Sequence, residues 1–217
     1  TSRCKIGRKE RGICAMIDGY GRTIDYVRIS VTDRCNLRCV YCMPEEGVCS
    51  ISHEEILRFG EIERVCQILA ENGIQKIKLT GGEPLVRRRL PELAAALKQI
   101  PGIKSLTITT NGVLLEEMYD ALADAGVDSV TISLDTLDAR TFAAITGQDL
   151  LPEVLLAIDA ALAAGLKVKV NAVSMPDTDW KRLITLAKDK PVDVRFIELM
   201  PIGEGRHSEG RSNEDLL

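Results

Sequence analysis

The fold is decided by the stretch Arg28-Ile29-Ser30-Val31-Thr32-Asp33-Arg34-Cys35-Asn36-Leu37-Arg38-Cys39-Val40-Tyr41-Cys42. This stretch joins a strand-like segment directly to three cysteines. The alternating first five residues predict a strand, and the cysteines follow with C-x3-C-x2-C spacing. A loop at the carboxyl end of such a strand is where barrel active sites are built. Three thiolates can wrap an iron–sulfur cluster, which ordinarily takes four cysteine ligands. One iron would then lack a protein ligand, and such an open position lets a metal bind a small molecule.

Two other interpretations of the cysteines stay open on this motif alone. The thiolates could form a zinc site completed by Cys49 or His53, or they could be buried cysteines without a metal. The chain has seven cysteines, an odd number, which is unlike the disulfide framework of a secreted domain. The crowding of three of them favours a metal site.

A second motif, Thr80-Gly81-Gly82-Glu83-Pro84, follows another strand-like segment. Adjacent glycines let the backbone approach a ligand closely, so its polar groups can bind an amino group. A plain turn between a strand and a helix is the alternative for a Gly-Gly pair. Together with the cysteines, the motif favours a cofactor site that includes Gly81, Gly82 and Glu83.

Strand-like segments alternate with helical patterns along the chain. We expect helices from a capping box at Ser52 and Glu55 toward Asn72, and over 91–97, 115–126, 152–165 and 183–187. Repeated strand-to-helix units predict a parallel sheet covered by helices. The six expected strands span residues 26–32, 76–80, 104–110, 128–135, 167–173 and 192–198.

The predicted strands carry polar residues on one face, although buried parallel strands usually read as continuous apolar runs. Helices need the apolar faces, so the polar rows must face a shared interior. We therefore expect an α/β fold, a partly closed barrel with a polar lumen, and the alternative is a sheet with one wet face. The rows are Arg28, Ser30 and Thr32; Lys76, Lys78 and Thr80; Thr107, Thr109 and Asn111; Thr131, Ser133 and Asp135; Lys167, Lys169 and Asn171; Asp193 and Arg195.

Length and charge narrow the class of protein. With 217 residues and 45% hydrophobic content, one globular domain is expected. The net charge is −4 and the sequence contains no basic block, which argues against a nucleic-acid-binding protein. The sequence also contains no long apolar run, which argues against a membrane-spanning protein. We expect a cytoplasmic protein. The chain opens with Thr1 and stops in an unfinished helical turn over 213–217, so we also expect a fragment.

The cysteine spacing, with Tyr41 before the last cysteine, and the Gly-Gly-Glu-Pro loop together resemble the radical SAM superfamily. The resemblance implies that Cys35, Cys39 and Cys42 bind a [4Fe–4S] cluster. It also implies that S-adenosylmethionine chelates the open iron and is cleaved to a 5′-deoxyadenosyl radical. In such enzymes the cofactor performs the difficult step, while the protein orients it and excludes side reactions.

Within the superfamily, five segments resemble the GTP 3′,8-cyclase family of molybdenum cofactor biosynthesis: 28–39, 79–87, 109–112, 132–135 and 195–201. This resemblance implies an incomplete (β/α)6 barrel. It places Tyr41, Gly82, Ser133 and Met200 at S-adenosylmethionine, and Arg28, Lys78, Thr109 and Lys169 at GTP. All four of these positions lie on the polar rows. A triphosphate needs several cations, and Arg195 shares the polar face with Arg28, Lys78 and Lys169.

Three departures from the family stand out. Lys78 replaces the usual Arg, so a forked phosphate contact becomes a point-charge contact. The family's second cluster, which holds the guanine, is bound by cysteines beyond Leu217; Cys4, Cys14, Cys49 and Cys66 lack the needed spacing, and Cys66 is expected in the core. Residues 1–17 do not align, and we expect a frayed extension before a partial barrel over 18–217.

The resemblance implies cyclisation of GTP to 3′,8-cyclo-7,8-dihydro-GTP. It implies a flavodoxin-like or other low-potential electron donor and a downstream cyclic pyranopterin monophosphate synthase, and it is compatible with a homodimer. The fragment alone is expected to be inactive on GTP. The alternatives are a radical SAM peptide-modifying maturase and, from another class, a zinc-binding module without activity. Peptide recognition would not require the set Arg28, Lys78 and Lys169.

Overall fold

A parallel sheet of six strands in chain order forms the centre of the computed structural model, which describes residues 5–6, 16–44, 46–47, 51–52, 54–176, 178–201, 203–212 and 214. Every strand expected from the alternation is confirmed, with ends that differ by a few residues. The strands are β4 (Tyr26–Ser30), β5 (Lys76–Thr80), β6 (Ser105–Thr110), β7 (Ser129–Ser133), β8 (Lys167–Ser174) and β9 (Val192–Glu198).

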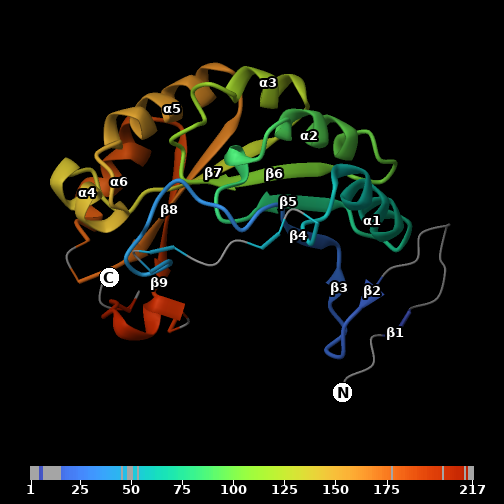
Figure 1. The fold of residues 1–217 in the computed structure, drawn as a ribbon, viewed down its shortest axis with the longest axis horizontal. Helices are drawn as coiled ribbons and strands as arrows, with labels where there is room; N and C mark the ends of the chain where they lie inside the picture. The colour runs from blue at the N-terminus through green and yellow to red at the C-terminus, as the bar shows by residue number, and fades with distance from the viewer. Residues whose placement is uncertain are drawn as a thin grey trace.

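Helices follow the outer side of the arched sheet (Figure 1). They are α1 (Phe59–Glu71), α2 (Leu90–Lys98), α3 (Tyr119–Asp124), α4 (Ala139–Thr146), α5 (Leu151–Ala163) and α6 (Trp180–Asp189), with 3₁₀ turns η1 (Pro84–Val86) and η2 (Gly203–His207). Within the described ranges no single helix is long and apolar enough to cross a membrane, although α4 and α5, joined at a 100° bend, meet those criteria as a pair.

The core lies between the outer face of the sheet and the helices. The apolar row of each inner strand is buried there, as Leu79 of β5, Ile108 of β6 and Val170 of β8 illustrate, and α5 adds Val154 and Ile158. Each such side chain stabilises the fold by roughly 1.5–3 kcal/mol relative to exposure. Because the helices take the apolar rows, the polar rows face the concave side, as the alternation predicts.

The concave side is curved enough to bring distant strands into contact. Neighbouring strands lie about 4.8 Å apart, yet the Lys78 ammonium on β5 reaches 3.5 Å from the Thr131 hydroxyl on β7, across β6. β4 and β9 are the two edges of the sheet and do not pair with each other. The fold is therefore an incomplete barrel, in agreement with the expected architecture.

The lumen is less uniformly solvated than the alternation predicts. On β7 both Ser129 and Thr131 are buried, although they belong to the polar face. The curvature explains this difference, because side chains from flanking strands such as Lys78 close over the middle of the sheet.

Helix α1 begins at Phe59, so the predicted start at Ser52 is wrong. The Ser52 hydroxyl donates to Glu55 within a local turn, whereas Glu61 accepts from the backbone N–H of Arg58 and caps the real helix. On this helix Cys66 is fully buried, as expected of a core thiol, and burial raises its pKa to about 11. Helix α4 was not among the expected helices; Asp138 caps it through the N–H of Thr141.

A small antiparallel sheet precedes the barrel strands in the chain (Figure 1). It consists of β1 (Lys5–Ile6), β2 (Met16–Ile17) and β3 (Thr23–Ile24). The described parts of the expected N-terminal extension are therefore paired as strands, whereas its boundary at residue 17 stays a prediction. Cys4, Cys14, Cys49 and His53 lie outside the described residues.

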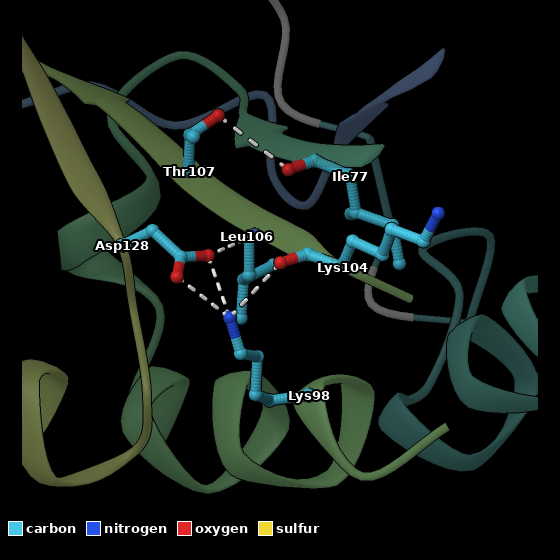
Figure 2. Close-up of polar contacts among 6 residues, drawn as sticks. All are labelled: Ile77, Lys98, Lys104, Leu106, Thr107 and Asp128. Atoms are coloured by element: carbon cyan, nitrogen blue, oxygen red, sulfur yellow. Dashed lines mark hydrogen bonds and ion pairs between the residues drawn. The ribbon is translucent and has the colours of Figure 1, made fainter. Parts of the chain in front are cut away.

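Asp128 ties the starts of two strands to a helix at the end of the barrel away from the cysteines. The Lys98 ammonium lies 2.6 and 2.7 Å from the two Asp128 carboxylate oxygens and 3.4 Å from the carbonyl oxygen of Lys104. Figure 2 shows how these side chains point toward one another. The same carboxylate accepts the N–H of Leu106 at 2.7 Å. It thereby satisfies a backbone donor at the beginning of β6.

Replacing Asp128 by alanine is expected to lower the free energy of unfolding by about 1–2 kcal/mol, because the Leu106 N–H loses its acceptor. Replacing Lys98 by methionine is expected to cost less, about 0.5 kcal/mol, since the ion pair is partly exposed and screened. Urea unfolding of both variants checks this order. Equal losses would mean that the ion pair, and not the backbone hydrogen bond, matters.

Candidate functional site

The three cysteines of the motif line one cavity of about 260 Å³ at the carboxyl ends of the strands. Because the loops after parallel strands meet at this edge, the cavity collects side chains from far apart in the chain. It brings together most of the predicted cofactor residues, and Thr109 as well. Besides the cysteines, the lining comprises Leu37, Tyr41, Thr80, Gly81, Gly82, Glu83, Thr109, Thr110, Asn111, Ser133, Asp135, Asn171, Val173 and Ile197.

Cys35, Cys39 and Cys42 supply the thiols that an iron–sulfur cluster takes as ligands. All three are free thiols. Among the described residues no three Cys, His, Asp or Glu side chains converge closely enough to hold one metal ion. A cubane, in contrast, spreads its cysteine ligands over separate irons. Burial raises the pKa of Cys39 to about 12 and raises those of Cys35 and Cys42, so binding of a metal must release protons.

Gly81 and Gly82 make close packing with the cysteine loop possible. A Cβ on Gly82 would lie 2.4 Å from the carbonyl oxygen of Arg34, and one on Gly81 would lie 2.6 Å from that of Thr32. The Gly82 N–H donates to Thr32 and the Glu83 N–H to Arg34, each at 2.7 Å. From the sequence, the glycines are expected to let a ligand approach, whereas in the structure they let another part of the backbone approach. An amino group donates hydrogen bonds, so the carbonyl oxygens of this loop, and not its N–H groups, would accept them.

Glu83 is buried and holds the loop after β5 to the end of β6. Its carboxylate accepts from the N–H of Leu85 at 2.9 Å, the hydroxyl of Thr110 at 2.7 Å and the N–H of Asn111 at 2.6 Å. Burial raises its pKa, and the three donors oppose that shift. These contacts describe a positioning residue, and its predicted contact with a cofactor stays a prediction.

Two further contacts fix the far side of the cysteine loop. The N–H groups of Arg38 and Val40 each donate at 2.9 Å to the carbonyls of Thr146 and Ile145, at the end of α4. The helix thereby satisfies two of its orphan carbonyls. The Tyr41 hydroxyl donates at 2.6 Å to Asp135.

Asp135 links the cysteine loop to two strands. It follows β7, and its second oxygen accepts the N–H of Val173 on β8 at 2.7 Å. Burial raises its pKa, and the hydrogen bonds from Tyr41 and Val173 oppose the shift. Tyr41 is also largely buried, and its pKa is raised by burial and by the neighbouring carboxylate. The aromatic residue between Cys39 and Cys42 is thus held in one orientation.

Asp135, Asn111 and Asn171 line the cavity, but the site predicted from the sequence leaves them out. The Asn111 amide lies 2.8 Å from the side-chain oxygen of Asn36 and 3.9 Å from the sulfur of Cys35. All three residues belong to the polar rows, so alternation carried a signal for them. The predicted site residues came instead from the family resemblance, which pointed to other positions.

Met200 lies outside this cavity, in an adjoining one. It is 61% exposed and lines an apolar cavity of about 310 Å³ that shares Tyr41, Cys42, Val173 and Ile197 with the first. The two cavities adjoin each other at these shared residues. The predicted position of Met200 beside the same ligand is therefore geometrically feasible.

Four cations meet on the concave face next to the cysteine cavity. Burial, and then repulsion from Arg28, Lys169 and Arg195, lowers the pKa of Lys78. No salt bridge of these four residues with an acid occurs in the part of the chain that the structure describes. Cations gathered from β4, β5, β8 and β9, with no ion pair to an acid among the described residues, favour a polyanion over a neutral ligand. Thr109, predicted beside them, instead lines the cysteine cavity.

Sequence comparison connects this site with known enzymes. The family model of the radical SAM superfamily matches residues 29–189. The chain is 53% identical over 192 residues to the GTP 3′,8-cyclase of Pelotomaculum thermopropionicum, covering 87% of this chain and 59% of that protein. It is 49% identical over 194 residues to the GTP 3′,8-cyclase of Heliobacterium modesticaldum, covering 88% of this chain and 59% of that protein. The chain thus spans about three fifths of the length of these relatives.

Structural comparison agrees. Streptococcus suis SuiB bound to S-adenosylmethionine is similar with a TM-score of 0.73 and 21% identity, covering 88% of this chain and 45% of that chain. This likeness shows the shared fold. The family match covers every residue that lines the cysteine cavity except Ile197, and on that ground the chain belongs to the radical SAM superfamily.

Proposed function

We propose that this chain is the catalytic barrel of a GTP 3′,8-cyclase, which converts GTP to 3′,8-cyclo-7,8-dihydro-GTP in the first step of molybdenum cofactor biosynthesis. Membership of the superfamily implies a [4Fe–4S] cluster and S-adenosylmethionine. When bound, the two supply one-electron cleavage of a sulfonium to a 5′-deoxyadenosyl radical. The observation that supports GTP as the substrate is the group of four cations around Lys78, on the polar face that also lines the cysteine cavity. The high identity to GTP 3′,8-cyclases supports it.

In this proposal Cys35, Cys39 and Cys42 hold the cluster. The loop over 80–83 presents carbonyl oxygens to the amino group of S-adenosylmethionine, and Ser133 and Tyr41 contact its nucleoside. The apolar cavity that Met200 lines suits a purine ring, because aromatic and apolar surfaces bury bases well. Thr109 lies in the same cavity as the cysteines, where a polar hydroxyl can orient either ligand.

Arg28, Lys78, Lys169 and Arg195 bind the triphosphate of GTP in this proposal. Each charge-assisted hydrogen bond to a phosphate stabilises the complex by about 1.5–3 kcal/mol. The cations lie on strands and not on mobile loops, so the site is ready before the substrate arrives. Their place beside the cysteine cavity brings a bound nucleotide next to the cofactor.

The function extends to features outside this chain. We propose that a second [4Fe–4S] cluster, held by cysteines after Leu217, binds the guanine, and that this chain alone does not complete the reaction. A low-potential donor such as flavodoxin supplies the electron, and a cyclic pyranopterin monophosphate synthase takes the product. A cytoplasmic location fits, because cluster thiolates must stay reduced.

An anaerobic assay of the full-length protein tests the substrate. Formation of 5′-deoxyadenosine should depend on GTP and fall when guanosine replaces it, because the cations bind phosphate. Production that is independent of GTP, or that requires a peptide, would contradict the proposal and favour a maturase. Replacing Lys188, an exposed lysine on outer helix α6, by alanine provides a control without effect.

The lowered pKa of Lys78 predicts how GTP binding depends on pH. A polyanion favours protonated Lys78, so binding takes up a proton, and affinity should decline as pH rises through the lowered pKa. The stability of the folded state changes with pH in the opposite direction. Because the folded pKa lies below the unfolded one, charged Lys78 opposes folding, and stability rises as pH increases from the folded toward the unfolded pKa.

Calorimetric titration with GTP over a series of pH values above neutrality measures this decline. Replacing Lys78 by arginine should flatten it, since a guanidinium stays charged throughout. A decline of the same steepness in both proteins would show that another group titrates.

A further inference from the structure

A second cavity, separate from that of the cysteines, is lined by arginines. It has a volume of about 520 Å³, larger than the cysteine cavity, and the two share no lining residue. Arg34, Arg58, Arg87 and Arg88 line it, and among the described residues its lining contains no acid. Because the chain as a whole has a net charge of −4, this is a local concentration of positive charge. Such a surface favours a negatively charged partner.

Arg87 belongs to the wall of this arginine cavity and is held in place by the protein. Its guanidinium donates to the carbonyl of Val31 at 2.5 Å and to that of Leu57 at 2.6 Å. It also lies over the ring of Phe59, 4.5 Å from the ring centre. Arg87 thereby joins the segment after β4 to the segment before α1, and it fixes the shape of the cavity.

Arg58 and Arg88, in contrast, present their charges to solvent. Both residues are exposed, and neither has a salt bridge in the ranges that the structure describes. The acids nearest to Arg58 in the sequence are engaged locally and do not line the cavity: Glu55 accepts from the Ser52 hydroxyl, and Glu61 from the backbone N–H of Arg58. The two guanidinium groups can therefore meet the carboxylates of a partner.

The arginine cavity borders the cysteine loop. Val31, Thr32 and Arg34 line it, and the next residue, Cys35, lines the cysteine cavity. One short segment thus contributes to both cavities. In the proposed function, S-adenosylmethionine and GTP occupy the cysteine cavity and the cations of the concave face. An electron donor must then reach the cluster from another side, and the arginine cavity borders the loop outside both ligand sites.

We propose that the arginine cavity is the docking surface for the electron donor, a small redox protein with an acidic surface. The proposal rests on the proposed function, in which each cleavage of S-adenosylmethionine consumes one electron. In the transfer the donor is oxidised by one electron and the cluster is reduced by one, with no bond or proton exchanged. Carboxylates of the donor pair with Arg58 and Arg88, which brings its redox centre toward Cys35. Complementary charge of this kind raises the rate of association more than the affinity.

The test uses the full-length protein, reconstituted under anaerobic conditions, with Arg58→Glu and Arg88→Glu combined. Lys181→Glu combined with Lys188→Glu is the matched control, because it changes the net charge equally. These exposed lysines lie on α6, which packs on β9, at the opposite edge of the sheet from β4. Calorimetry measures binding of an oxidised flavodoxin of strongly negative net charge. Stopped-flow absorbance measures reduction of the cluster without GTP, by that flavodoxin once reduced and by reduced methyl viologen, a small cation. Thermal unfolding verifies that each variant is folded.

At low ionic strength we expect flavodoxin to reduce the arginine double variant at least tenfold more slowly than the wild type or the lysine control, because electrostatic steering is lost. The oxidised flavodoxin should also bind this variant more weakly. Added salt should slow the wild type and remove most of the difference. Methyl viologen should reduce the arginine variant as fast as the wild type or faster, since arginines repel a cation. These opposite responses distinguish lost docking from a damaged cluster.

Equal rates and affinities for flavodoxin in the wild type and the arginine variant would overturn the proposal. Binding of inorganic phosphate to the wild type alone would then assign the arginines to a small anion. A wild-type cluster that methyl viologen reduces and flavodoxin does not would also overturn it. The choice of substrate does not affect these outcomes, because GTP is absent. A reconstituted protein without iron would refute the proposed function, and the docking proposal with it.

Discussion

Replacing Gly82 by alanine is expected to reduce the iron bound per chain to on the order of a tenth of the wild-type value, the range seen when groups that support metal ligands are lost. The added Cβ would lie 2.4 Å from the carbonyl oxygen of Arg34 and 2.7 Å from that of Asp33. Both contacts are with backbone, which cannot rotate away, so the cysteine loop must shift. The shift breaks the hydrogen bonds from Gly82 to Thr32 and from Glu83 to Arg34.

Gly60 provides the matched control for this substitution. It lies near the start of α1, and nothing stands within 4 Å of a Cβ placed there. Alanine at this position should stabilise the protein by about 0.5–1 kcal/mol and leave the iron content unchanged. Iron quantification and visible absorbance after anaerobic reconstitution measure both variants. Normal iron content in Gly82→Ala would mean that the cysteine loop adapts, and that its contact with Gly82 does not set the cluster site.

Replacing Lys78 by glutamate is expected to weaken GTP binding by about a hundredfold or more. The substitution removes a charge-assisted contact and places a negative charge among Arg28, Lys169 and Arg195. The same substitution should stabilise the free protein slightly, by about 0.5 kcal/mol, because it relieves repulsion that solvent partly screens. Weaker GTP binding together with higher stability of the free protein distinguishes a substrate site from a structural contact.

Calorimetric titration with GTP and urea unfolding measure these two effects. Lys188→Glu on α6 is the matched control and should change neither quantity by more than a small amount. Lys78→Arg restores the residue usual in the resembling family and should bind GTP at least as tightly, since a guanidinium can contact two phosphate oxygens. Loss of stability together with loss of binding in Lys78→Glu would contradict the assignment.

Much of the fold follows from local pattern alone. Alternation placed the strands and separated the row with Lys78 from the row with Leu79, because an amphipathic strand has one face for helices and one for the lumen. The start of α1 could not be predicted in this way. Ser52 and Glu55 look like a capping box, but the neighbouring pair Arg58 and Glu61 caps the helix instead.

The site was predictable where residues are adjacent in the chain, and less so where they meet through the fold. The cysteine spacing is a local signal. The contact of Tyr41 with Asp135 spans 94 positions and depends on the curvature of the sheet. Likewise, the Gly-Gly pair predicts that another group packs closely against this loop. The sequence does not predict that this group is the backbone of Thr32 and Arg34. Only the folded chain identifies that partner.

We propose above all that Cys35, Cys39 and Cys42 hold a [4Fe–4S] cluster with one iron free to bind S-adenosylmethionine. The most direct test is electron paramagnetic resonance of this chain after anaerobic reconstitution and reduction, before and after addition of S-adenosylmethionine. We predict the signal of a reduced [4Fe–4S] cluster that changes when S-adenosylmethionine is added, and its loss in Cys39→Ala. A bound zinc ion, or a cluster signal indifferent to S-adenosylmethionine, would contradict the account.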